Sequence, residues 1–394
     1  MESVTVTRGG LSRQHYRVVV VGCGAIGASV AWHLAQAGVQ DVAVIEKEYG
    51  PGLGSSSKAN GGFRSQWSSP PNIRFSQFSV PALESMASRH PAMAFHQVGY
   101  LFVTGTEQGE RQLRQGLDLQ TELGVEVDWV DPAFVAEVAP FIRIEGLRGG
   151  TFGRRDGTVD PYQVATAFAD EARAAGVEIH TGTEVTAISA DGDAFTVMTT
   201  RGPLECDWLV NAAGPYAAEI AAMVGVELPV RPVRRNLALT QPVYDGHPAS
   251  PMCIDFETKL LVRTEGPAFL LSYSDPDEPP SFDTSFQPKF LEQVAERAGN
   301  RFPFLEDLQI DDKKCWAGLY PETPDHHAII GPAADLPRFV QCAGFGGHGI
   351  MHSPAAGRAV CELIQLGRAE TFDLRPFRPS RFAEGDLTIE VGAL

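Results

Sequence analysis

The apolar and polar positions near the start of the chain predict a strand, a tight turn, a helix and a second strand. Residues 18–21 form a continuous apolar run, which is typical of a buried strand. Three glycines then follow with the spacing Gly-x-Gly-x-x-Gly, and the stretch before Gly38 has the apolar spacing of a helix. A second apolar run ends at the acidic residue Glu46. We therefore predict a β–α–β unit over residues 17–46.

The middle of the chain has a different pattern of strands. Residues 207–214 again resemble a buried strand that ends in a turn of small residues. Between about residues 230 and 301, short strands are separated by Pro and Gly, which favours an antiparallel sheet. The earlier pattern returns after Trp316, with a strand at residues 339–343, a glycine-rich turn and a helix.

These alternations predict an α/β fold with an added antiparallel sheet. A Rossmann-like dinucleotide-binding domain is expected to be interleaved with a substrate domain built on a mostly antiparallel β-sheet. The nucleotide domain is expected at residues 15–80, 150–225 and 316–385, and the substrate domain at residues 81–149 and 226–315. Because 394 residues exceed one ordinary hydrophobic core, the length agrees with two domains.

Composition and charge exclude several classes of function. The chain has 49 Asp and Glu against 32 Lys and Arg, a formal net charge of −17, whereas binding a nucleic acid requires a basic face. No apolar run approaches the roughly 20 residues that span a bilayer, and the first residues lack the apolar core of a signal peptide. Six scattered cysteines without a Cys-x-x-Cys pair predict buried thiols in a reducing compartment, with no metal site. A cytoplasmic protein is expected.

The first glycine motif has the residues that a dinucleotide site requires. Gly22 permits the tight turn, Gly24 lets the backbone approach a pyrophosphate, and Gly27 lets the helix pack closely on the strand. The helix start offers free amides and a positive dipole to the phosphates. Glu46 is placed to accept hydrogen bonds from a ribose diol, which disfavours NADP. NAD and FAD both remain possible at this point.

A second glycine-rich loop at residues 344–349 favours FAD over NAD. It lies between a predicted strand and a predicted helix, so its backbone can approach a flat ligand and the helix start supplies positive charge. A flavin needs such a site because reduction places negative charge on the pyrimidine end of its ring. A nicotinamide enzyme has no evident need for it.

Taken together, six segments resemble the FAD-dependent D-amino-acid oxidase superfamily, in its sarcosine oxidase (beta subunit), glycine oxidase and dye-linked proline dehydrogenase branch. They are GCGAIGAS with Glu46, ANGGFRSQ, RDGTVDPYQ, NAAGPYAAEIA, WAGLYPETPDHHAIIG and GFGGHGIMHSPAAGRAV, in the family's order between Arg17 and Leu366. The resemblance implies a glutathione-reductase-like FAD-binding domain. It also implies contacts with FAD for these residues: Gly22, Gly24, Ala25, Ile26, Gly27, Glu46, Lys47, Ser56, Ser57, Gly61, Gly62, Val185, Ala213, Gly214, Gly318, Gly346, Gly347, His348, Gly349 and Ile350.

Two departures from the family's pattern concern the attachment of the flavin. Relatives that link it covalently use a Cys or a His at the places that Gly318 and Lys58 hold here. Neither residue forms that bond, so we expect noncovalent FAD.

The substrate end differs from the relatives as well. The resemblance places Tyr320 where glycine-oxidase-like members have a carboxylate-binding Arg, and Met351 where monomeric sarcosine oxidases have a Lys. Arg64 remains as the cation for a substrate carboxylate, because its planar fork suits that group. His348 is expected to orient the substrate or to take its amine proton. Tyr320 and Tyr273 are candidates for hydrogen bonds to the substrate, although buried tyrosines in a core explain them equally well.

These observations predict an FAD-dependent amine or amino-acid oxidase or dehydrogenase. It would oxidise the C–N bond of a small amine or amino acid, such as a sarcosine- or proline-like compound, to an imine by hydride transfer to flavin N5. Two alternatives remain: a noncatalytic flavoprotein or complex subunit, and an NAD-dependent dehydrogenase. The electron acceptor is oxygen or another molecule, and the absence of a Lys near Leu270 favours the latter. The substrate and the state of homo- or hetero-oligomerisation stay open.

Overall fold

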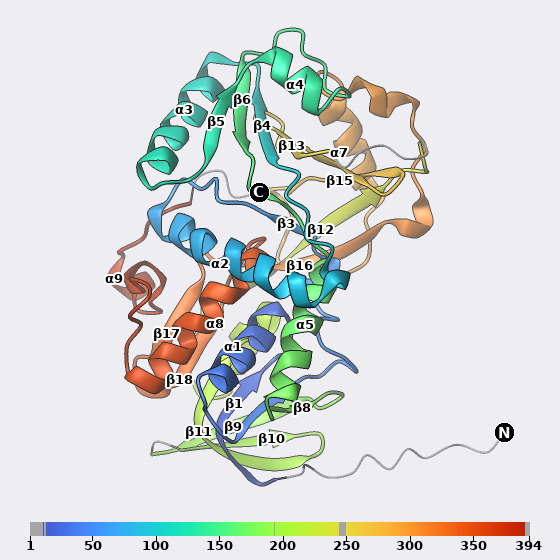
Figure 1. Ribbon diagram of the computed structural model, residues 1–394. Helices are drawn as coiled ribbons and strands as arrows, with labels where there is room; N and C mark the ends of the chain where they lie inside the picture. Colours follow the sequence, from blue (N-terminus) through green and yellow to red (C-terminus); the bar gives the residue numbers. More distant parts are fainter. Residues whose placement is uncertain (1–10, 12, 193, 244–249, 391–394) are drawn as a thin grey trace, which may run out of the picture.

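The computed structural model describes residue 11 and residues 13–192, 194–243 and 250–390. The described chain forms two lobes, each built on an eight-stranded sheet, and helix α2 (Pro70–Arg89) lies between them (Figure 1). The fold class predicted from the sequence is confirmed, because one sheet is mostly parallel and the other mostly antiparallel.

The lower lobe in Figure 1 contains the parallel sheet. Its strand order is β17 (Ile329–Ala333), β18 (Leu336–Ala343), β11 (Gly202–Asn211), β1 (His15–Val21), β2 (Val42–Ile45) and β8 (Glu178–His180), and the hairpin β9 (Val185–Asp191) and β10 (Ala194–Thr199) extends it beside β11. Strands β18, β11, β1, β2 and β8 run parallel to one another, while β17 is antiparallel to β18. The carboxyl ends of the parallel strands therefore meet at one edge of the sheet.

Strand β1 is apolar throughout its second half because both of its faces are buried. Val18 and Val20 pack with the helices on one side, whereas Val19 and Val21 belong to a separate apolar cluster on the other side. Helices α1 (Ala25–Gln36), α5 (Pro161–Ala174) and α8 (Gly349–Leu366) cover the first face. The second face is covered by the β9–β10 hairpin and α6 (Ala217–Ala222).

The upper lobe contains the second sheet. Its strand order is β16 (Trp316–Glu322), β12 (Arg231–Leu239), β15 (Ala268–Ser272), β14 (Leu261–Glu265), β13 (Met252–Asp255), β4 (Tyr100–Thr104), β6 (Gly149–Gly153) and β5 (Val127–Val130). All neighbours are antiparallel except β13 and β4. Alternate side chains of β4 separate two environments: Leu101 and Val103 join the large outer core, whereas Tyr100 and Phe102 join a smaller cluster on the opposite face.

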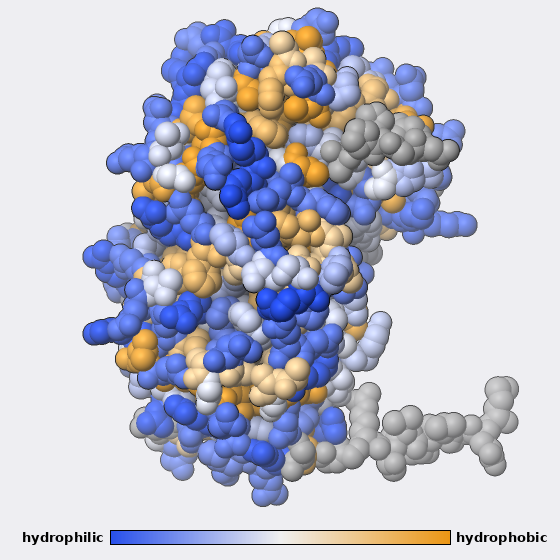
Figure 2. Space-filling view, viewed as in Figure 1, coloured by the Kyte–Doolittle hydropathy of each residue, from blue (hydrophilic) through white to orange (hydrophobic). Residues whose placement is uncertain are grey.

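The outer core of this sheet is covered by α4 (Pro132–Val138) and α7 (Lys289–Ala298). Figure 2 shows mainly polar residues on the viewed face, with a group of apolar residues around α4. The remaining described elements are α3 (Glu107–Glu122), α9 (Arg381–Glu384), the two-stranded pair β3 (Gly62–Phe63) and β7 (Gly157–Thr158), and the short 3₁₀ turns η1 (Ser56–Lys58), η2 (Pro91–Met93), η3 (Gly214–Tyr216), η4 (Pro303–Asp307), η5 (Asp312–Lys314) and η6 (Arg375–Phe377).

Two strands lie outside the lobes that the predicted domain boundaries give them. β16 pairs with β12, and β6 pairs with β4 and β5, so both belong to the upper sheet although residues 150–225 and 316–385 were expected in the nucleotide domain. The apolar pattern of β16 gave no sign of its distant partner, since pairing partners are not encoded in a strand's own pattern. The remaining division into domains stays a prediction.

The described residues can also be compared with the expectations for cysteines, membrane spans and metal sites. All six cysteines are free, and all but Cys315 are buried. No described helix combines the length and the apolar character that crossing a membrane requires. Within the same described ranges, no group of three or more His, Cys, Asp or Glu is arranged to hold a metal ion.

Candidate active site

The turn between β1 and α1 lies against the end of β11, and two of its glycines are required by this packing. A Cβ on Gly22, which has φ +97°, would lie 2.5 Å from the carbonyl oxygen of Ala212. A Cβ on Gly27 would lie 1.9 Å from the carbonyl oxygen of Gly22. A Cβ on Gly24 would lie 3.2 Å from its nearest neighbour, the Ser56 hydroxyl. Packing within the protein therefore does not by itself require a glycine at this position.

The start of α1 presents backbone amides at the carboxyl edge of the sheet. Gly24, the N-cap residue, makes no side-chain cap, and the Ala25 amide donates to the Ser56 hydroxyl at 3.0 Å. Early helix amides have no acceptor within the helix and carry partial positive charge. Ser56 lies in the serine-rich loop between β2 and α2 (residues 51–69), whose Ser57 hydroxyl donates to the Leu53 carbonyl at 3.2 Å. The arrangement suits an anionic group in front of α1.

Glu46 lies directly after β2, at the same edge. Its carboxylate accepts from the Cys23 amide at 2.6 Å and from the Glu48 amide at 2.8 Å, and burial raises its pKa. A carboxylate offers more than two acceptor positions, so Glu46 has capacity left for ribose hydroxyls. The neighbouring Lys47 ammonium lies 3.2 Å from the centre of the Tyr216 ring.

Three further predicted cofactor residues lie in the parallel-sheet lobe. Ala213 and Gly214 follow β11 at its carboxyl end, where η3 begins. Val185 is the first residue of β9, and its side chain is buried. Ala213 and Gly214 thus follow the strand that pairs with β1, and Val185 belongs to the same apolar cluster as Val21 and Ile45.

The second glycine loop connects β18 to α8 at this edge. Gly346 has φ +49°, and its amide donates to the Pro321 carbonyl at 2.9 Å. A Cβ on Gly347 would lie 2.7 Å from the Tyr320 ring, so this position must stay small. Helix α8 begins at Gly349 with His348 as its N-cap, which makes no side-chain hydrogen bond to the helix, and Ile350 in its first turn is buried.

The serine-rich loop then passes between the two lobes. A Cβ on Gly61 would lie 2.3 Å from the Val159 carbonyl oxygen, and one on Gly62 would lie 2.5 Å from the Met252 sulfur. A Cβ on Gly318 would lie 2.6 Å from the Lys58 Cβ. Gly318 and Lys58, the two positions that the resemblance associates with covalent attachment of flavin, are therefore neighbours.

Arg64 lies on a buried aromatic surface close to the start of α8. Its guanidinium carbon is 4.1 Å from the centre of the Trp67 ring and within 5.5 Å of the Tyr100 and Phe102 rings, and the residue is 3% exposed. The Trp67 ring also meets the His348 ring edge to face, with 4.3 Å between centroids. Two residues that the sequence singled out separately, Arg64 and His348, are thus brought together by Trp67.

Asp156 fixes the loop that carries Arg64. Its carboxylate accepts from the Ser65 amide at 2.8 Å and from the Gln66 side-chain amide at 3.1 Å. Burial is the main cause that raises the pKa of Asp156 to about 7, and the nearby Arg64 charge opposes the rise. Sequence reasoning missed this residue, although it lies in the RDGTVDPYQ segment that carried the resemblance.

The histidines beside Trp67 are held in their neutral form. Burial lowers the pKa of His348 well below its ordinary value, and the charge of Arg64 adds to the effect. His352, one turn later in α8, has its pKa lowered to about 3 by burial. Its Nε2 lies 3.1 Å from the Ser76 hydroxyl of α2. An imidazole in this state orients a partner by hydrogen bonding and holds no positive charge.

The two candidate tyrosines have different surroundings. Tyr320 on β16 contacts Gly347 and lies beside the Arg235 guanidinium, 5.4 Å from its ring centre, and burial raises its pKa. Tyr273, after β15, belongs instead to the outer core, where its hydroxyl accepts from Arg297 at 2.6 Å. The structure therefore brings Tyr320, but not Tyr273, to the group around His348. A strand's register decides which face a side chain takes, and the sequence alone did not show it.

Comparison with known proteins assigns the family. The family model described as FAD dependent oxidoreductase (DAO) matches residues 17–363. The chain belongs to this family. The oxidoreductase is 29% identical over 423 residues to FAD-dependent oxidoreductase domain-containing protein 1 of Xenopus laevis, across 95% of this chain and 84% of that protein. It is 26% identical to the glycine oxidase of Bacillus licheniformis, across 94% of this chain and 98% of the relative.

A solved structure agrees over nearly the whole oxidoreductase. The crystal structure of L-proline dehydrogenase from P. horikoshii superposes with a TM-score of 0.90 and 29% sequence identity, covering 95% of this chain and 100% of that one. The resemblance inferred from the six segments is thus confirmed, and so is FAD as the cofactor.

The residues present fit FAD at the edge of the parallel sheet. The uncapped start of α1, the small residue at Gly24 and the acceptor Glu46 match the pyrophosphate and ribose of the cofactor. The second helix start, at α8, is next to the Arg64 and Trp67 group, as a flavin ring between two lobes requires.

Proposed function

We propose that this oxidoreductase oxidises the C–N bond of a small amino acid with a secondary or primary amine, and that Arg64 binds the substrate carboxylate. The observation that carries the proposal is the position of Arg64: buried, stacked on Trp67 and one ring away from His348 at the start of α8. A planar guanidinium fixed in this way offers paired donors to a carboxylate in a site shielded from water.

The relatives support an amino acid as the substrate. Glycine oxidase and L-proline dehydrogenase both carry such a substrate in their names, and both match this chain along nearly all of their length. Glycine is a primary amine and proline a secondary amine, so their shared features are a carboxylate and a C–H bond next to nitrogen. Those two features define the proposed substrate class.

The chain's own residues hold and orient the substrate. Arg64 supplies positive charge, while neutral His348 and the protonated phenol of Tyr320 offer hydrogen bonds. Bound FAD would supply the acceptor for a hydride from the substrate carbon. Gly318 and Lys58 leave the cofactor without a covalent link, so we propose that FAD is bound noncovalently.

An anaerobic substrate panel tests this function. Purified protein loaded with FAD is mixed without oxygen with sarcosine, L-proline, glycine and D-alanine, and the loss of oxidised-flavin absorbance is followed. We expect at least one of these compounds to bleach the flavin. If the flavin keeps its absorbance with every compound, amino-acid oxidation is wrong, and a noncatalytic flavoprotein is the better account.

A further inference from the structure

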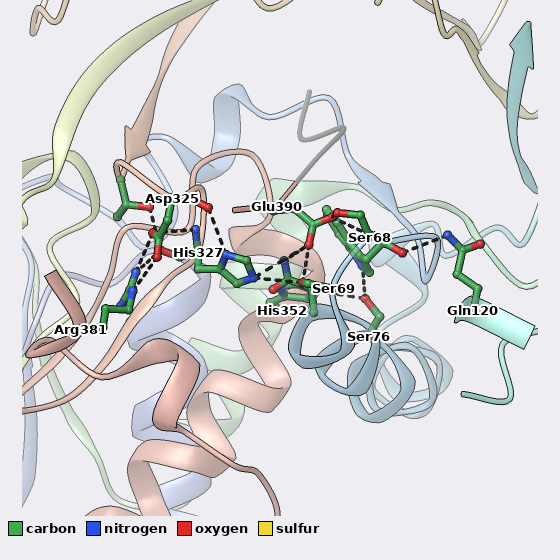
Figure 3. A network of polar contacts seen from close by, with 12 residues as sticks. Ser68, Ser69, Ser76, Gln120, Asp325, His327, His352, Arg381 and Glu390 are labelled. Atoms are coloured by element: carbon green, nitrogen blue, oxygen red, sulfur yellow. Dashed lines mark hydrogen bonds and ion pairs between the residues drawn. The ribbon is translucent and has the colours of Figure 1, made fainter. Parts of the chain in front are cut away.

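The segment after α9 returns to the middle of the molecule and buries one carboxylate there (Figure 3). Glu390 is 2% exposed, while its neighbour Ile389 is 62% exposed. The segment therefore runs along the surface with a single acidic side chain pointing inward. Burying a carboxylate is costly unless several donors satisfy it, so its partners indicate what it does.

The partners of Glu390 are the residues at the start of α2. Its carboxylate accepts from the Ser68 amide at 2.7 Å, the Ser68 hydroxyl at 2.6 Å and the Asn72 side-chain amide at 2.9 Å, and it also accepts from the Ser69 hydroxyl. Ser69 is the N-cap of α2 and makes no side-chain cap of its own. Glu390 thus gives this helix start the negative charge that its dipole favours, from the far end of the chain.

The other side of the segment is fixed to the β16–β17 connection. The Glu390 amide donates to the Asp325 carbonyl at 3.2 Å, and His327 Nε2 lies 3.0 Å from the Ser69 hydroxyl and 4.0 Å from the Glu390 carboxylate. The Asp325 carboxylate is held in turn by Arg381 of α9 through two hydrogen bonds of 2.7 and 2.9 Å. Figure 3 shows these groups in one continuous network.

This network leads to the proposed substrate site through Trp67. Trp67 immediately precedes Ser68, and its carbonyl accepts from Gln120 at 3.0 Å. Its indole N–H donates to the Ser76 hydroxyl of α2 at 2.8 Å, and that hydroxyl donates to the Arg64 carbonyl at 2.7 Å. The position of the first turns of α2 therefore sets the position of both Trp67 and the Arg64 backbone.

We propose that Glu390 is a positioning residue, and that residues 387–390 form a C-terminal strap that fixes the Arg64–Trp67 loop for substrate binding. Asp156 holds this loop at Ser65, and Glu390 holds it at Ser68, so the guanidinium and the indole between them are fixed from both ends. The hydrogen bonds described above are sufficient to argue that the loop is fixed. The effect on substrate binding rests in addition on the proposed function of Arg64.

Hydrogen exchange tests the strap directly. Two variants remove it: Glu390→Gln, and a chain that ends at residue 386. Their matched controls are Glu384→Gln, which changes an exposed carboxylate of α9, and a chain that ends at residue 390. Losing hydrogen bonds to a buried charge should speed amide exchange across residues 65–73 by about tenfold or more. Peptides from β1 and both control proteins should keep their rates. Unchanged exchange over residues 65–73 in both strap variants overturns the proposal.

Ligand binding separates the strap from the function on which its consequence rests. The probe is pyrrole-2-carboxylate, an unreactive planar carboxylate, and its Kd is measured from the change in flavin absorbance. We expect Glu390→Gln to raise this Kd about tenfold, and to have little further effect when Arg64→Lys is already present, because both act on the same contact. Additive effects of the two substitutions overturn the positioning role. If Arg64→Lys binds the probe as tightly as the unsubstituted protein, the carboxylate role of Arg64 is wrong, whereas faster exchange still supports the strap.

Discussion

Among single residues, Arg64 is the most important for the proposed function, because it is buried and its guanidinium has a fixed orientation over Trp67. A lysine keeps the charge but loses the planar fork and the stacking on Trp67. We expect Arg64→Lys to raise the Kd for pyrrole-2-carboxylate by about ten- to a hundredfold, since hydrogen bonds between charged groups contribute about 1.5–3 kcal/mol. FAD affinity, measured on the same samples, should stay unchanged. Equal probe affinity in both proteins would contradict the assignment.

Asp156 makes the stability of the fold depend on pH. Burial raises its pKa from 3.8 to about 7 in the folded state, so between these values the folded chain retains a proton that the unfolded chain has lost. The protonated carboxyl therefore contributes fully to the free energy of unfolding below about pH 4. This contribution is lost as the pH rises to about 7, at a rate of up to about 1.4 kcal/mol per pH unit.

Asp156→Asn should remove this dependence, because the amide is neutral at every pH. Urea unfolding is measured at pH 4.5, 6 and 8, from just above the lower pKa to above the higher one. The free energy of unfolding of the unsubstituted protein should fall relative to that of the variant as the pH rises. Asp128→Asn, at an exposed ion pair with Arg154, serves as the control and should retain the loss. Parallel curves for Asp156→Asn and the unsubstituted protein would show that Asp156 is not the group responsible.

Sequence reasoning found the residues that belong to contiguous motifs and missed those that act across the fold. Arg64 and His348 were identified from glycine-rich segments, but their meeting at Trp67 depends on how α2 and α8 pack. Asp156 lies within the RDGTVDPYQ segment, but neither it nor Glu390 was singled out as a functional residue. An acidic residue in a loop or a tail is most often solvated, and only burial distinguishes these two.

At the scale of elements, the β1–α1 turn separates glycines needed for packing from one needed for the cofactor. A methyl group on Gly24 meets only the Ser56 hydroxyl within the described chain, at 3.2 Å, but it projects where the pyrophosphate is expected. Gly24→Ala should therefore leave the apoprotein's Tm within about 2–4 °C and weaken FAD binding by about ten- to a hundredfold, the effect of about 1–3 kcal/mol of overpacking. Thermal unfolding of the apoprotein gives the Tm, and titration of the apoprotein with FAD gives the affinity.

Gly54→Ala is the matched control for this turn. A Cβ at Gly54 meets no atom within 4 Å among the described residues, and its backbone lies outside the left-handed region. It should bind FAD as the unsubstituted protein does. Gly24→Ala with normal FAD affinity would mean that the cofactor does not approach the turn at this residue.

The apolar pattern of the sequence predicted individual strands and helices better than it predicted which strands pair. The parallel strands and both glycine loops were predicted from local apolar runs, because each such run is a contiguous signal. β16 was placed in the wrong lobe, since its pairing with β12 joins residues far apart in the sequence. Tyr273 was chosen for its hydroxyl, but it follows β15 directly and lies in the outer core with Phe269 and Leu271 of that strand.

At the scale of the whole molecule, cofactor binding should stabilise the fold. The expected FAD contacts come from β1, β2, β11 and α8, which are distant in sequence and adjacent in the parallel-sheet lobe. FAD at 100 times its Kd should add about 2.7 kcal/mol to the free energy of unfolding, seen as a higher Tm in calorimetry. NAD at the same concentration should leave the Tm unchanged. Stabilisation by NAD alone would contradict the fit of FAD to this site.

In the proposed function, the molecule holds an amino acid by its carboxylate while the adjacent C–H bond is oxidised. The most direct test compares L-proline with pyrrolidine, the same ring without the carboxylate, as anaerobic reductants of the bound FAD. Should proline not reduce the flavin, the amino acid that bleaches it in the substrate panel is paired with its own decarboxylated amine. We expect the amino acid to reduce the flavin much faster than the amine, and Arg64→Lys to remove most of this difference. Equal rates for the two compounds in the unsubstituted protein would contradict the proposed function.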